Sequence, residues 1–556
     1  MNASMENVTP DTLPLIAHAR ATDGPAWTPP FRNIGQILAA RVAADPDKIA
    51  LTFYGESGRE VQLTNAELDR RAIAVAQQLR HTLNLQAGDR IATLLMNDWR
   101  TVLLYCGAWM AGVTVVPLNI GEDDERLAYI LENSEARAVF TFGEQAERLA
   151  QLQAGRPELA NIVTLSELAE APDPNGELPD VPTETEALIV YTSGTTGAPK
   201  GVVLDQSNLI ADAQSIAEWH RFGPDDRAMC VLPIHHVNGT VVTIVTPLFS
   251  GGSLVLNRRF HAMTFWQTLA AEGCTWVSVV PTVLAFLNER KIDLAQYDLS
   301  RFRHIICGAG PLTTELAHRF HETYGVRVVH GYGLSETTCY SCFLPIDLDP
   351  DAYKHWMFDC GFPSIGCPIP ANAMAIHDEQ GNALPPDARG EIVIRGYNVM
   401  RYYFKRPDAN RDTFAHGWFR SGDEGFYRQG EDGLDYYFIT GRLKELIIRG
   451  GINYSPFDID EVLNAIPGIK AAMAVGFENN FYGEEIGAYV QLEEGATLTA
   501  DIIIRACREK LPYSKTPKVV LFGTEFPVTS TGKYQRNKLK PRFAEWKDHQ
   551  FREEKK

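Results

Sequence analysis

A run rich in glycine and hydroxyl groups follows the apolar residues 187–191 and carries one lysine. Glycines let a backbone turn tightly so that its N–H groups point at one anion, and hydroxyls and a lysine add donors and positive charge. The run therefore predicts a phosphate-binding loop that follows a strand. It is not a Walker A loop, because a proline stands where that motif has its second glycine. Its residues are Thr192, Ser193, Gly194, Thr195, Thr196, Gly197, Ala198, Pro199 and Lys200.

Three more charged residues lie among glycines, serines and threonines. Glu336 could hold Mg²⁺ against phosphate oxygens, and Asp423 could accept two hydrogen bonds from a ribose diol. Lys533 follows a Thr-Gly pair, which is typical of a cation brought in by a moving segment. Each residue also has a structural interpretation, namely a helix cap for Glu336, a turn for Asp423 and a solvated surface lysine for Lys533.

These segments, taken in order, resemble the motifs of the adenylate-forming enzymes, the superfamily of acyl-CoA synthetases, peptide-synthetase adenylation domains and beetle luciferases. Seven motifs in the same order would be very hard to obtain by chance. The resemblance covers nearly the whole chain and leaves out about the first thirty residues. The matching segments are residues 191–202, 232–239, 307–312, 331–338, 421–423, 441–451 and 529–536.

The resemblance implies an enzyme that binds ATP, Mg²⁺ and coenzyme A. It would form an acyl-adenylate with release of pyrophosphate and then transfer the acyl group to the CoA thiol. The resemblance assigns the metal to Glu336, beside Thr337, and makes Lys533 the adenylation catalyst. It places His236 at the acyl site near the path of the thiol.

The same resemblance assigns the nucleotide to several loops. Tyr332 would stack on adenine, Asp423 would bind the ribose, and Arg442 would reach the ribose or phosphate. The lid would rotate about Lys444 between the two half-reactions. The complete set expected to bind ATP or CoA is Thr192, Ser193, Gly194, Thr195, Thr196, Gly197, Lys200, Gly308, Ala309, Gly310, Gly331, Tyr332, Gly333, Ser335, Asp423, Arg442, Lys444, Arg449, Gly450 and Gly451.

The acyl pocket is expected to exclude amino acids, because residues 235–239 lack the aspartate with which peptide-synthetase domains hold an ammonium group. Residues 237–239, 307–310 and 334–342 also contain no Lys or Arg, so a second substrate carboxylate would lack a partner. A neutral aliphatic or aromatic tail is therefore favoured. The residues expected to line the pocket are His236, Val237, Asn238, Gly239, Cys307, Gly308, Leu334 and Tyr340.

Two alternatives stay open from the sequence. The same adenylation could serve transfer to an acyl-carrier protein or an amine, since the nucleotide residues would not differ. More remotely, the chain could be a nucleotide-binding protein without catalysis, which the presence of Lys200, Glu336, Asp423 and Lys533 opposes.

Composition restricts the class of protein further. A chain of 556 residues is expected to hold two or more domains, and its net charge of −18 opposes nucleic acid or a membrane surface as a general partner. No apolar run approaches the roughly twenty residues of a membrane span, and the N-terminus lacks the pattern of a signal peptide. We expect a cytoplasmic enzyme, and the sequence does not predict its oligomeric state. The nine cysteines are interpreted as small core residues.

The order of expected elements predicts an α/β fold. Strand and helix patterns alternate to about residue 340, which predicts a large N-terminal domain of several subdomains with mainly parallel sheets. The elements after about residue 445 are shorter and predict a small, mobile α+β lid. It includes a helix that opens at Ser455 with Asp458 completing a capping box, a helix over 501–511, and strands over 471–475, 488–492 and 519–522. We divide the chain into an N-terminal extension (1–30), an AMP-binding domain (31–440), a hinge (441–445) and the lid (446–556).

Overall fold

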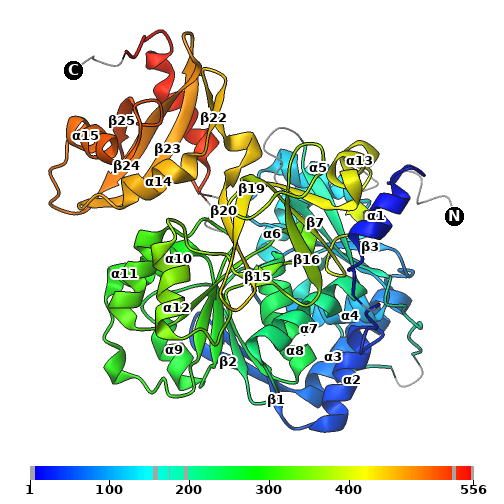
Figure 1. Ribbon diagram of the computed structural model, residues 1–556. Coiled ribbons are helices and arrows are strands. Elements are labelled where there is room, and N and C mark those ends of the chain that lie inside the picture. The colour runs from blue at the N-terminus through cyan, green and yellow to red at the C-terminus, as the bar shows by residue number, and fades with distance from the viewer. Residues whose placement is uncertain are drawn as a thin grey trace.

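The structure is a computed structural model that describes residues 7–24, 26–153, 161–173, 176–192, 198–528 and 534–552. A large body is formed by the N-terminal three quarters of the chain, and a smaller C-terminal unit sits against one side of it (Figure 1). The N-terminus lies at the opposite side of the body from this unit. The α/β class and the two-part architecture predicted from the sequence are confirmed.

A nine-stranded sheet forms the first layer of the body. Its central strands run parallel because helices connect them, whereas the strand pairs toward its two edges are antiparallel. In spatial order the strands are β15 (Cys367–Pro368), β14 (Cys342–Phe343), β13 (Val328–Tyr332), β12 (His304–Cys307), β11 (Trp276–Val279), β9 (Arg227–Cys230), β10 (Ser253–Asn257), β1 (Ile49–Gly55) and β2 (Gly58–Thr64).

A seven-stranded sheet forms the second layer, and a four-stranded antiparallel sheet completes the body. The seven strands are β18 (Tyr402–Tyr403), β8 (Lys200–Asp205), β7 (Glu186–Thr192), β4 (Thr114–Leu118), β3 (Arg90–Leu94), β5 (Ala138–Thr141) and β6 (Asn161–Thr164). The four strands are β16 (Asn372–His377), β17 (Gly390–Gly396), β19 (Phe419–Gln429) and β20 (Asp435–Arg442).

Helices cover these sheets and bury their apolar faces. They are α2 (Ile34–Ala44), α3 (Asn65–Gln77), α4 (Trp99–Met110), α5 (Asp124–Ser134), α6 (Gly143–Gln153), α7 (Gln206–His220), α8 (Thr246–Ser250), α9 (Phe265–Ala271), α10 (Pro281–Arg290), α11 (Thr314–Tyr324), α12 (Pro350–Lys354) and α13 (Pro407–Thr413). A π-helical turn, Asn238–Val245, leads into α8. Among the described helices, none has both the length and the apolar character needed to cross a bilayer.

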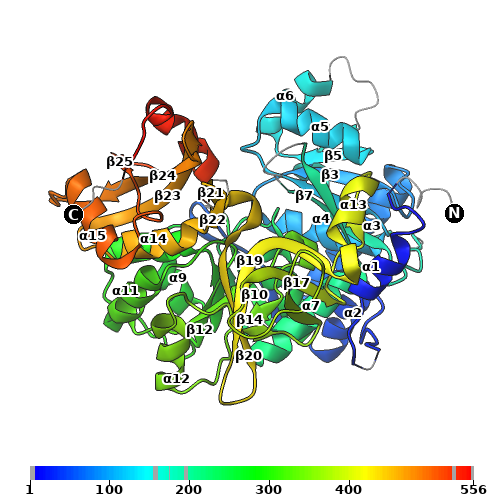
Figure 2. The ribbon, with the colours of Figure 1, turned by 45° about the horizontal axis from the view of Figure 1, so that its top comes forward.

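The lid is built on a sheet that Figure 2 shows beside the body. Its strands are β21 (Ile447–Arg449), β22 (Ile452–Tyr454), β23 (Ile469–Asn479), β24 (Gly483–Leu492) and β25 (Val519–Phe522), and its helices are α14 (Pro456–Asn464) and α15 (Ala500–Lys510). Ser455 caps α14 as expected, because its hydroxyl accepts the N–H of Phe457. The capping box predicted for Asp458 is wrong. Its carboxylate instead pairs with Arg389 of the body and Lys515 of the lid.

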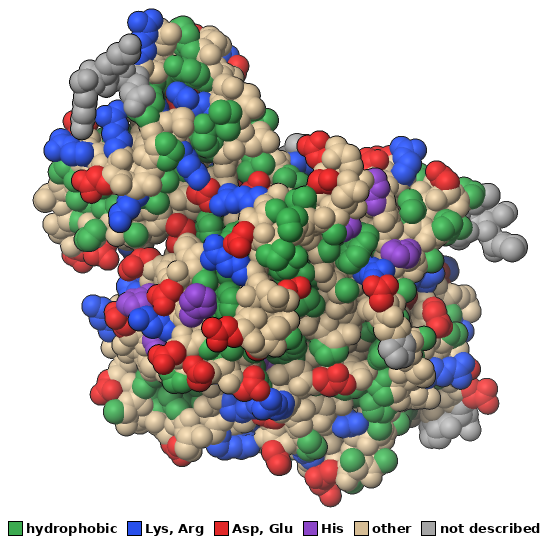
Figure 3. Space-filling view, viewed as in Figure 1, with side chains coloured by type: hydrophobic (Ala, Val, Ile, Leu, Met, Phe, Trp, Pro, Cys, Tyr) green, Lys and Arg blue, Asp and Glu red, His purple; other side chains and the backbone are tan. Residues whose placement is uncertain are grey.

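The described part of residues 1–30 packs on the body. Helix α1 (Leu13–Ala19) buries Ile16 and Ala19 in the main core. Arg20 forms an ion pair of 2.7 Å with Asp205, which caps α7. On the face seen in Figure 3, acidic and basic side chains are interspersed over both the lid and the body.

Candidate active site

The predicted nucleotide loops meet at the carboxyl ends of β12 and β13. These strands are parallel neighbours, with Cys307 paired to His330, so the segments that follow them lie side by side. Their glycines are needed for close approach. A Cβ atom on Gly308 would lie 2.6 Å from the carbonyl oxygen of Gly331, and one on Gly333 would lie 2.0 Å from that of Cys339. Gly310 has ordinary room.

Two non-glycine residues in these loops hold left-handed backbone conformations. Ala309 has φ of 61° between its two glycines, and Thr338 has φ of 65°. The hydroxyl of Thr338 donates to the carbonyl oxygen of Asn398 at 2.6 Å, which helps to hold this conformation. Strain of this kind costs about 1–3 kcal/mol per residue and gathers at functional sites.

Glu336 and Lys200 meet through a tyrosine. The Glu336 carboxylate accepts a hydrogen bond of 2.7 Å from the Tyr403 hydroxyl, and the Lys200 ammonium lies 4.0 Å from the centre of the Tyr403 ring. Burial lowers the pKa of Lys200, while the nearby Glu336 opposes that shift. Burial and Glu336 together raise the pKa of Tyr403, so this phenol stays neutral and donates. The buried Glu336 carboxylate therefore contacts the hydroxyl of Tyr403, and the desolvated Lys200 ammonium lies over the face of the same ring.

The Tyr403 contact was not predicted from the sequence. Its strand, β18, is two residues long and pairs with β8, the strand that begins at Lys200. Nothing in the run Tyr402-Tyr403-Phe404 distinguishes the site tyrosine from its neighbours. Only the pairing of β18 with β8 brings Tyr403 close to both Lys200 and Glu336.

Asp423, Tyr332 and Arg442 form a second cluster. The Tyr332 hydroxyl donates to Asp423 at 2.8 Å, and the Arg442 guanidinium lies 3.0 Å from the other carboxylate oxygen. Asp423 is 1 % exposed and faces Arg442 across the β19–β20 pair. Burial and the Asp423 charge raise the pKa of Tyr332. The three residues expected at adenine and ribose are thus brought together, with the carboxylate charge balanced by Arg442.

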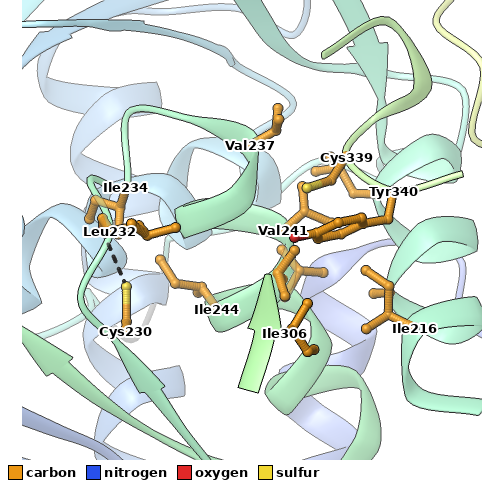
Figure 4. Close-up of a cluster of buried hydrophobic side chains, with 14 of the residues drawn as sticks. Ile216, Cys230, Leu232, Ile234, Val237, Val241, Ile244, Ile306, Cys339 and Tyr340 are labelled. Carbon is orange, nitrogen blue, oxygen red and sulfur yellow. Dashed lines mark hydrogen bonds between the residues drawn. The ribbon is translucent and has the colours of Figure 1, made fainter. Parts of the chain in front are cut away.

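Two of the expected acyl-pocket residues, Val237 and Tyr340, belong to the cluster of buried hydrophobic side chains drawn in Figure 4. Asn238 donates to the Tyr340 hydroxyl at 3.2 Å, and Val237 and Cys307 are buried. The imidazole of His236 lies 4.4 Å from that of His235, whose pKa burial lowers to about 4, so His235 is neutral near pH 7. A Cβ on Gly239 would lie 2.4 Å from the carbonyl oxygen of Pro233.

The turn after β13 holds four of the predicted residues. Ser335, Glu336 and Thr337 form one 3₁₀ turn, and the backbone N–H of Leu334 donates to the Thr337 hydroxyl at 3.1 Å. Leu334 is partly buried and packs against the main core. The turn therefore directly follows Gly331, Tyr332 and Gly333 in the chain, and it buries Glu336 and Thr337.

Other predicted residues lie apart from these clusters. Arg449 is paired within the lid, 2.6 Å from Glu485 and 4.0 Å above the Tyr482 ring, next to the exposed turn residues Gly450 and Gly451. Lys444 is exposed, and its charge adds to the effect of burial in lowering the pKa of Lys200. The described contacts of Arg449 are with other residues of the lid.

Six predicted residues lie outside the described part of the chain, namely Ser193, Gly194, Thr195, Thr196, Gly197 and Lys533. The two ends of the phosphate loop are described. Thr192 and Lys200 pair directly across the β7–β8 hairpin. This pairing agrees with a loop delivered by a strand.

Specific contacts hold the lid against the body. The Glu461 carboxylate accepts the backbone N–H of Thr314, the first residue of α11, at 3.1 Å. Arg389 pairs with Asp458 at 2.9 Å, and Lys470 pairs with Glu289 at 2.7 Å. Each of these contacts would break if the lid rotated.

Comparison with known proteins decides the family. The family model described as "AMP-binding enzyme" matches residues 38–404, and the model of its C-terminal domain matches residues 458–533. The chain belongs to the AMP-binding enzyme family. Both matches fall on the two parts seen in the fold, and together they confirm the resemblance stated from the seven motifs.

Relatives of this family member cover nearly its whole length. A sulfoacetate–CoA ligase of Cupriavidus necator is 37 % identical, covering 92 % of this chain and 97 % of its own. An oxalate–CoA ligase of Arabidopsis thaliana is 30 % identical, covering 90 % and 96 %. The crystal structure of ATP-bound MatB from Rhodopseudomonas palustris matches with a TM-score of 0.81 at 27 % identity, covering 92 % and 99 %. The chain is accordingly an acid–thiol ligase that uses ATP and joins a carboxylic acid to coenzyme A.

Proposed function

We propose that the clusters around Glu336 and Asp423 carry out both half-reactions of this ligase. In the first, a carboxylate oxygen attacks the α-phosphorus of ATP and pyrophosphate leaves. In the second, the CoA thiol attacks the acyl carbon and AMP leaves. The observation that carries the proposal is that two polar clusters form, one of Lys200, Glu336 and Tyr403 and one of Asp423, Tyr332 and Arg442, because adenylation needs charge neutralisation together with a nucleotide site.

The residues at Glu336 suit Mg²⁺. The carboxylate is largely buried, it is held in place by the Tyr403 hydroxyl, and Mg²⁺ commonly uses one or two carboxylates with substrate phosphates and water. A bound Mg²⁺ would neutralise phosphate charge during the attack. Glu336 would hold the ion, with Thr337 next to it, while Lys200 and the loop from Thr192 would bind phosphate oxygens.

The remaining roles follow from the positions of the side chains. Asp423 would accept the ribose hydroxyls, with Arg442 balancing its charge, and Tyr332 would lie against adenine. Lys533 would reach the reacting carboxylate from the lid. For thiolation the lid would turn about Lys444 and bring Arg449, Gly450 and Gly451 toward the path of the thiol, beside His236.

The acid is proposed to have a neutral tail, since the described acyl cluster is formed by apolar side chains, amides and hydroxyls around Tyr340. The relative named for sulfoacetate makes a doubly anionic acid the alternative to test. The free thiols of the described cysteines, eight of them buried, suit a reducing compartment, so we include the cytoplasm in this proposal.

Pyrophosphate release with MgATP tests the proposal. It should require an acid, increase with CoA, and fall at least ~10²-fold in Glu336→Gln, the effect of removing one charge-stabilising group. An exposed glutamate such as Glu509, changed to Gln, is the control and should leave the rate unchanged. Release that does not respond to CoA would instead indicate an acyl-carrier protein or an amine as the acceptor.

A further inference from the structure

Asn398 is a fully buried asparagine that lies two residues after the end of β17. Its amide nitrogen donates to the carbonyl oxygen of Tyr340 at 2.9 Å. The same nitrogen lies 3.2 Å from side-chain oxygens of Asp212 and of Asn372. Breaking a hydrogen bond of a buried amide leaves a polar group without water or a partner, which is costly. The amide of Asn398 therefore fixes the chain that follows Glu336 to its surroundings.

Three hydrogen bonds join the chain that follows the Glu336 turn to residues 398–400. The backbone N–H of Met400 donates to the carbonyl oxygen of Glu336 at 2.8 Å. The hydroxyl of Thr338 donates to the carbonyl oxygen of Asn398 at 2.6 Å, and the third bond is the one from the Asn398 amide to Tyr340. Every second residue from Glu336 onward is thus tied to the same short segment.

Thr338 lies at the centre of a strained γ-turn. Its φ and ψ are 65° and −51°, and the backbone N–H of Cys339 donates to the carbonyl oxygen of Thr337 at 2.7 Å. This form of the γ-turn is rare, and a positive φ is unusual for a β-branched residue. Such a conformation persists only where the surrounding structure holds it. Asn398 bonds to the centre of the turn and to the residue two positions later, so it supplies that support.

Helix α7 holds the segment of Asn398 in turn. The amide of Asn208 donates to the carbonyl oxygens of Tyr397 and Val399 at 2.8 Å and 2.9 Å. Asp212 lies one turn further along the helix and faces the Asn398 amide. Burial raises the pKa of the Asp212 carboxyl well above its usual range, which favours its neutral form. The helix therefore supports the γ-turn through Asn398.

We propose that Asn398 is a positioning residue for the metal ion, because it holds the γ-turn that fixes the backbone of Glu336. The inference rests on the proposed function, since it takes the Glu336 carboxylate to be the ligand of Mg²⁺. Asn398 would act through hydrogen bonds to the chain and not by touching the ion. Residues that orient a metal ligand from behind typically contribute 10–100-fold to metal affinity, so a change of that size is expected here.

The test measures Mn²⁺ binding by electron paramagnetic resonance in the complex with α,β-methylene-ATP, an analogue that cannot release pyrophosphate. Mn²⁺ suits the same oxygen ligands as Mg²⁺. Asn398→Ala should weaken Mn²⁺ binding roughly 10–100-fold. Its affinity for AMP without metal should stay that of the wild type, because adenine and ribose are assigned to Tyr332 and Asp423. A variant that is only less stable would not separate the two affinities in this way.

A second pair of variants changes the γ-turn itself. Thr338→Val replaces the hydroxyl by a methyl group of similar size and should weaken Mn²⁺ binding roughly 2–10-fold, the scale of one hydrogen bond. Thr338→Ser keeps the hydroxyl and should keep the affinity. Asn65→Ala is the matched control for Asn398→Ala, since Asn65 is also buried and its amide donates to the Asp45 carbonyl oxygen at 2.7 Å, at the start of α3. It should leave Mn²⁺ binding unchanged.

Outcomes for the two proposals can be told apart. If Glu336→Gln weakens Mn²⁺ binding but folded Asn398→Ala does not, the inference is overturned and the proposed role of Glu336 stands. If Asn398→Ala does not fold, equal Mn²⁺ affinity in Thr338→Val and Thr338→Ser would overturn the inference. A wild-type complex that holds Mn²⁺ no more tightly than the free analogue does would contradict the metal role of Glu336, and the inference with it.

Discussion

Arg536 ties the segment that carries Lys533 to the core of the lid. One guanidinium nitrogen lies 2.6 Å from the Asp460 carboxylate, and another donates to the carbonyl oxygen of Ala474. Asp460 in turn accepts the N–H of Ala474 at 2.6 Å. The side chains of Arg536 and Asp460 are 5 % and 11 % exposed. The pair therefore joins three parts of the lid, namely α14, β23 and the segment after Lys533.

Arg536→Met should loosen this junction. Removing one partner of a buried ion pair costs about 3–5 kcal/mol. Burial already raises the pKa of Asp460, so the carboxyl that Arg536→Met leaves without its partner can become protonated, which relieves part of the cost. We therefore expect a loss of stability at the lower end of this range. A loss of about 3 kcal/mol in the stability of the lid corresponds to roughly 10²-fold faster hydrogen exchange of its backbone amides.

Hydrogen exchange of peptides from β23 and α14 measures this effect. Adenylation should fall in parallel, because Arg536 lies three residues after Lys533, the proposed catalyst. The double variant Asp460→Asn/Arg536→Met should recover much of the protection, since no buried charge is left unpaired. Arg552→Met, at an exposed arginine, should change stability by no more than about 0.5 kcal/mol. Unchanged exchange in β23 of Arg536→Met would refute the reasoning.

Three further predictions concern the site and the lid. Lys533→Ala should lower pyrophosphate release at least ~10²-fold with ATP still bound, and near-normal release would remove Lys533 from the mechanism. Asp423→Asn should reduce the preference for ATP over 2′-deoxyATP about tenfold, because hydrogen bonds to a charged group contribute about 1.5–3 kcal/mol, and an unchanged ratio would contradict the ribose assignment. Burial raises the pKa of Glu461 from 4.5 to about 8, so its contribution to lid docking is complete below pH 4.5 and is lost as the pH rises through 8. The protection factor of the Thr314 amide, which is corrected for the intrinsic pH dependence of exchange, should fall over that range in the wild type but not in Glu461→Gln, and equal pH profiles of this protection factor would contradict the assignment.

The sequence predicted the parts of the site that are local. The strand that leads to Thr192 and the start of α14 at Ser455 are each specified by neighbouring residues. Strand 519–522 was predicted with the bounds of β25. Strands 471–475 and 488–492 were predicted too short, because the pairing of β23 with β24 continues beyond their apolar runs.

Contacts between distant segments could not be read from the sequence. Tyr403 reaches Glu336 only through the pairing of β18 with β8. Asp458 has the local sequence of a capping residue but lies opposite Arg389, so the ion pair replaces the cap. Residues 1–30 were treated as an extension because no motif falls in them, yet Arg20 and Ile16 pack on the body through residues far along the chain.

The central claim is that the Glu336 and Asp423 clusters adenylate an acid and pass it to CoA. The most direct measurement is single-turnover formation of acyl-AMP and acyl-CoA from MgATP and a carboxylic acid, followed by mass spectrometry, with and without CoA. The account predicts acyl-AMP alone without CoA and its conversion to acyl-CoA when CoA is added. Acyl-CoA formed without any acyl-AMP, or acyl-AMP that persists unchanged in the presence of CoA, would contradict it.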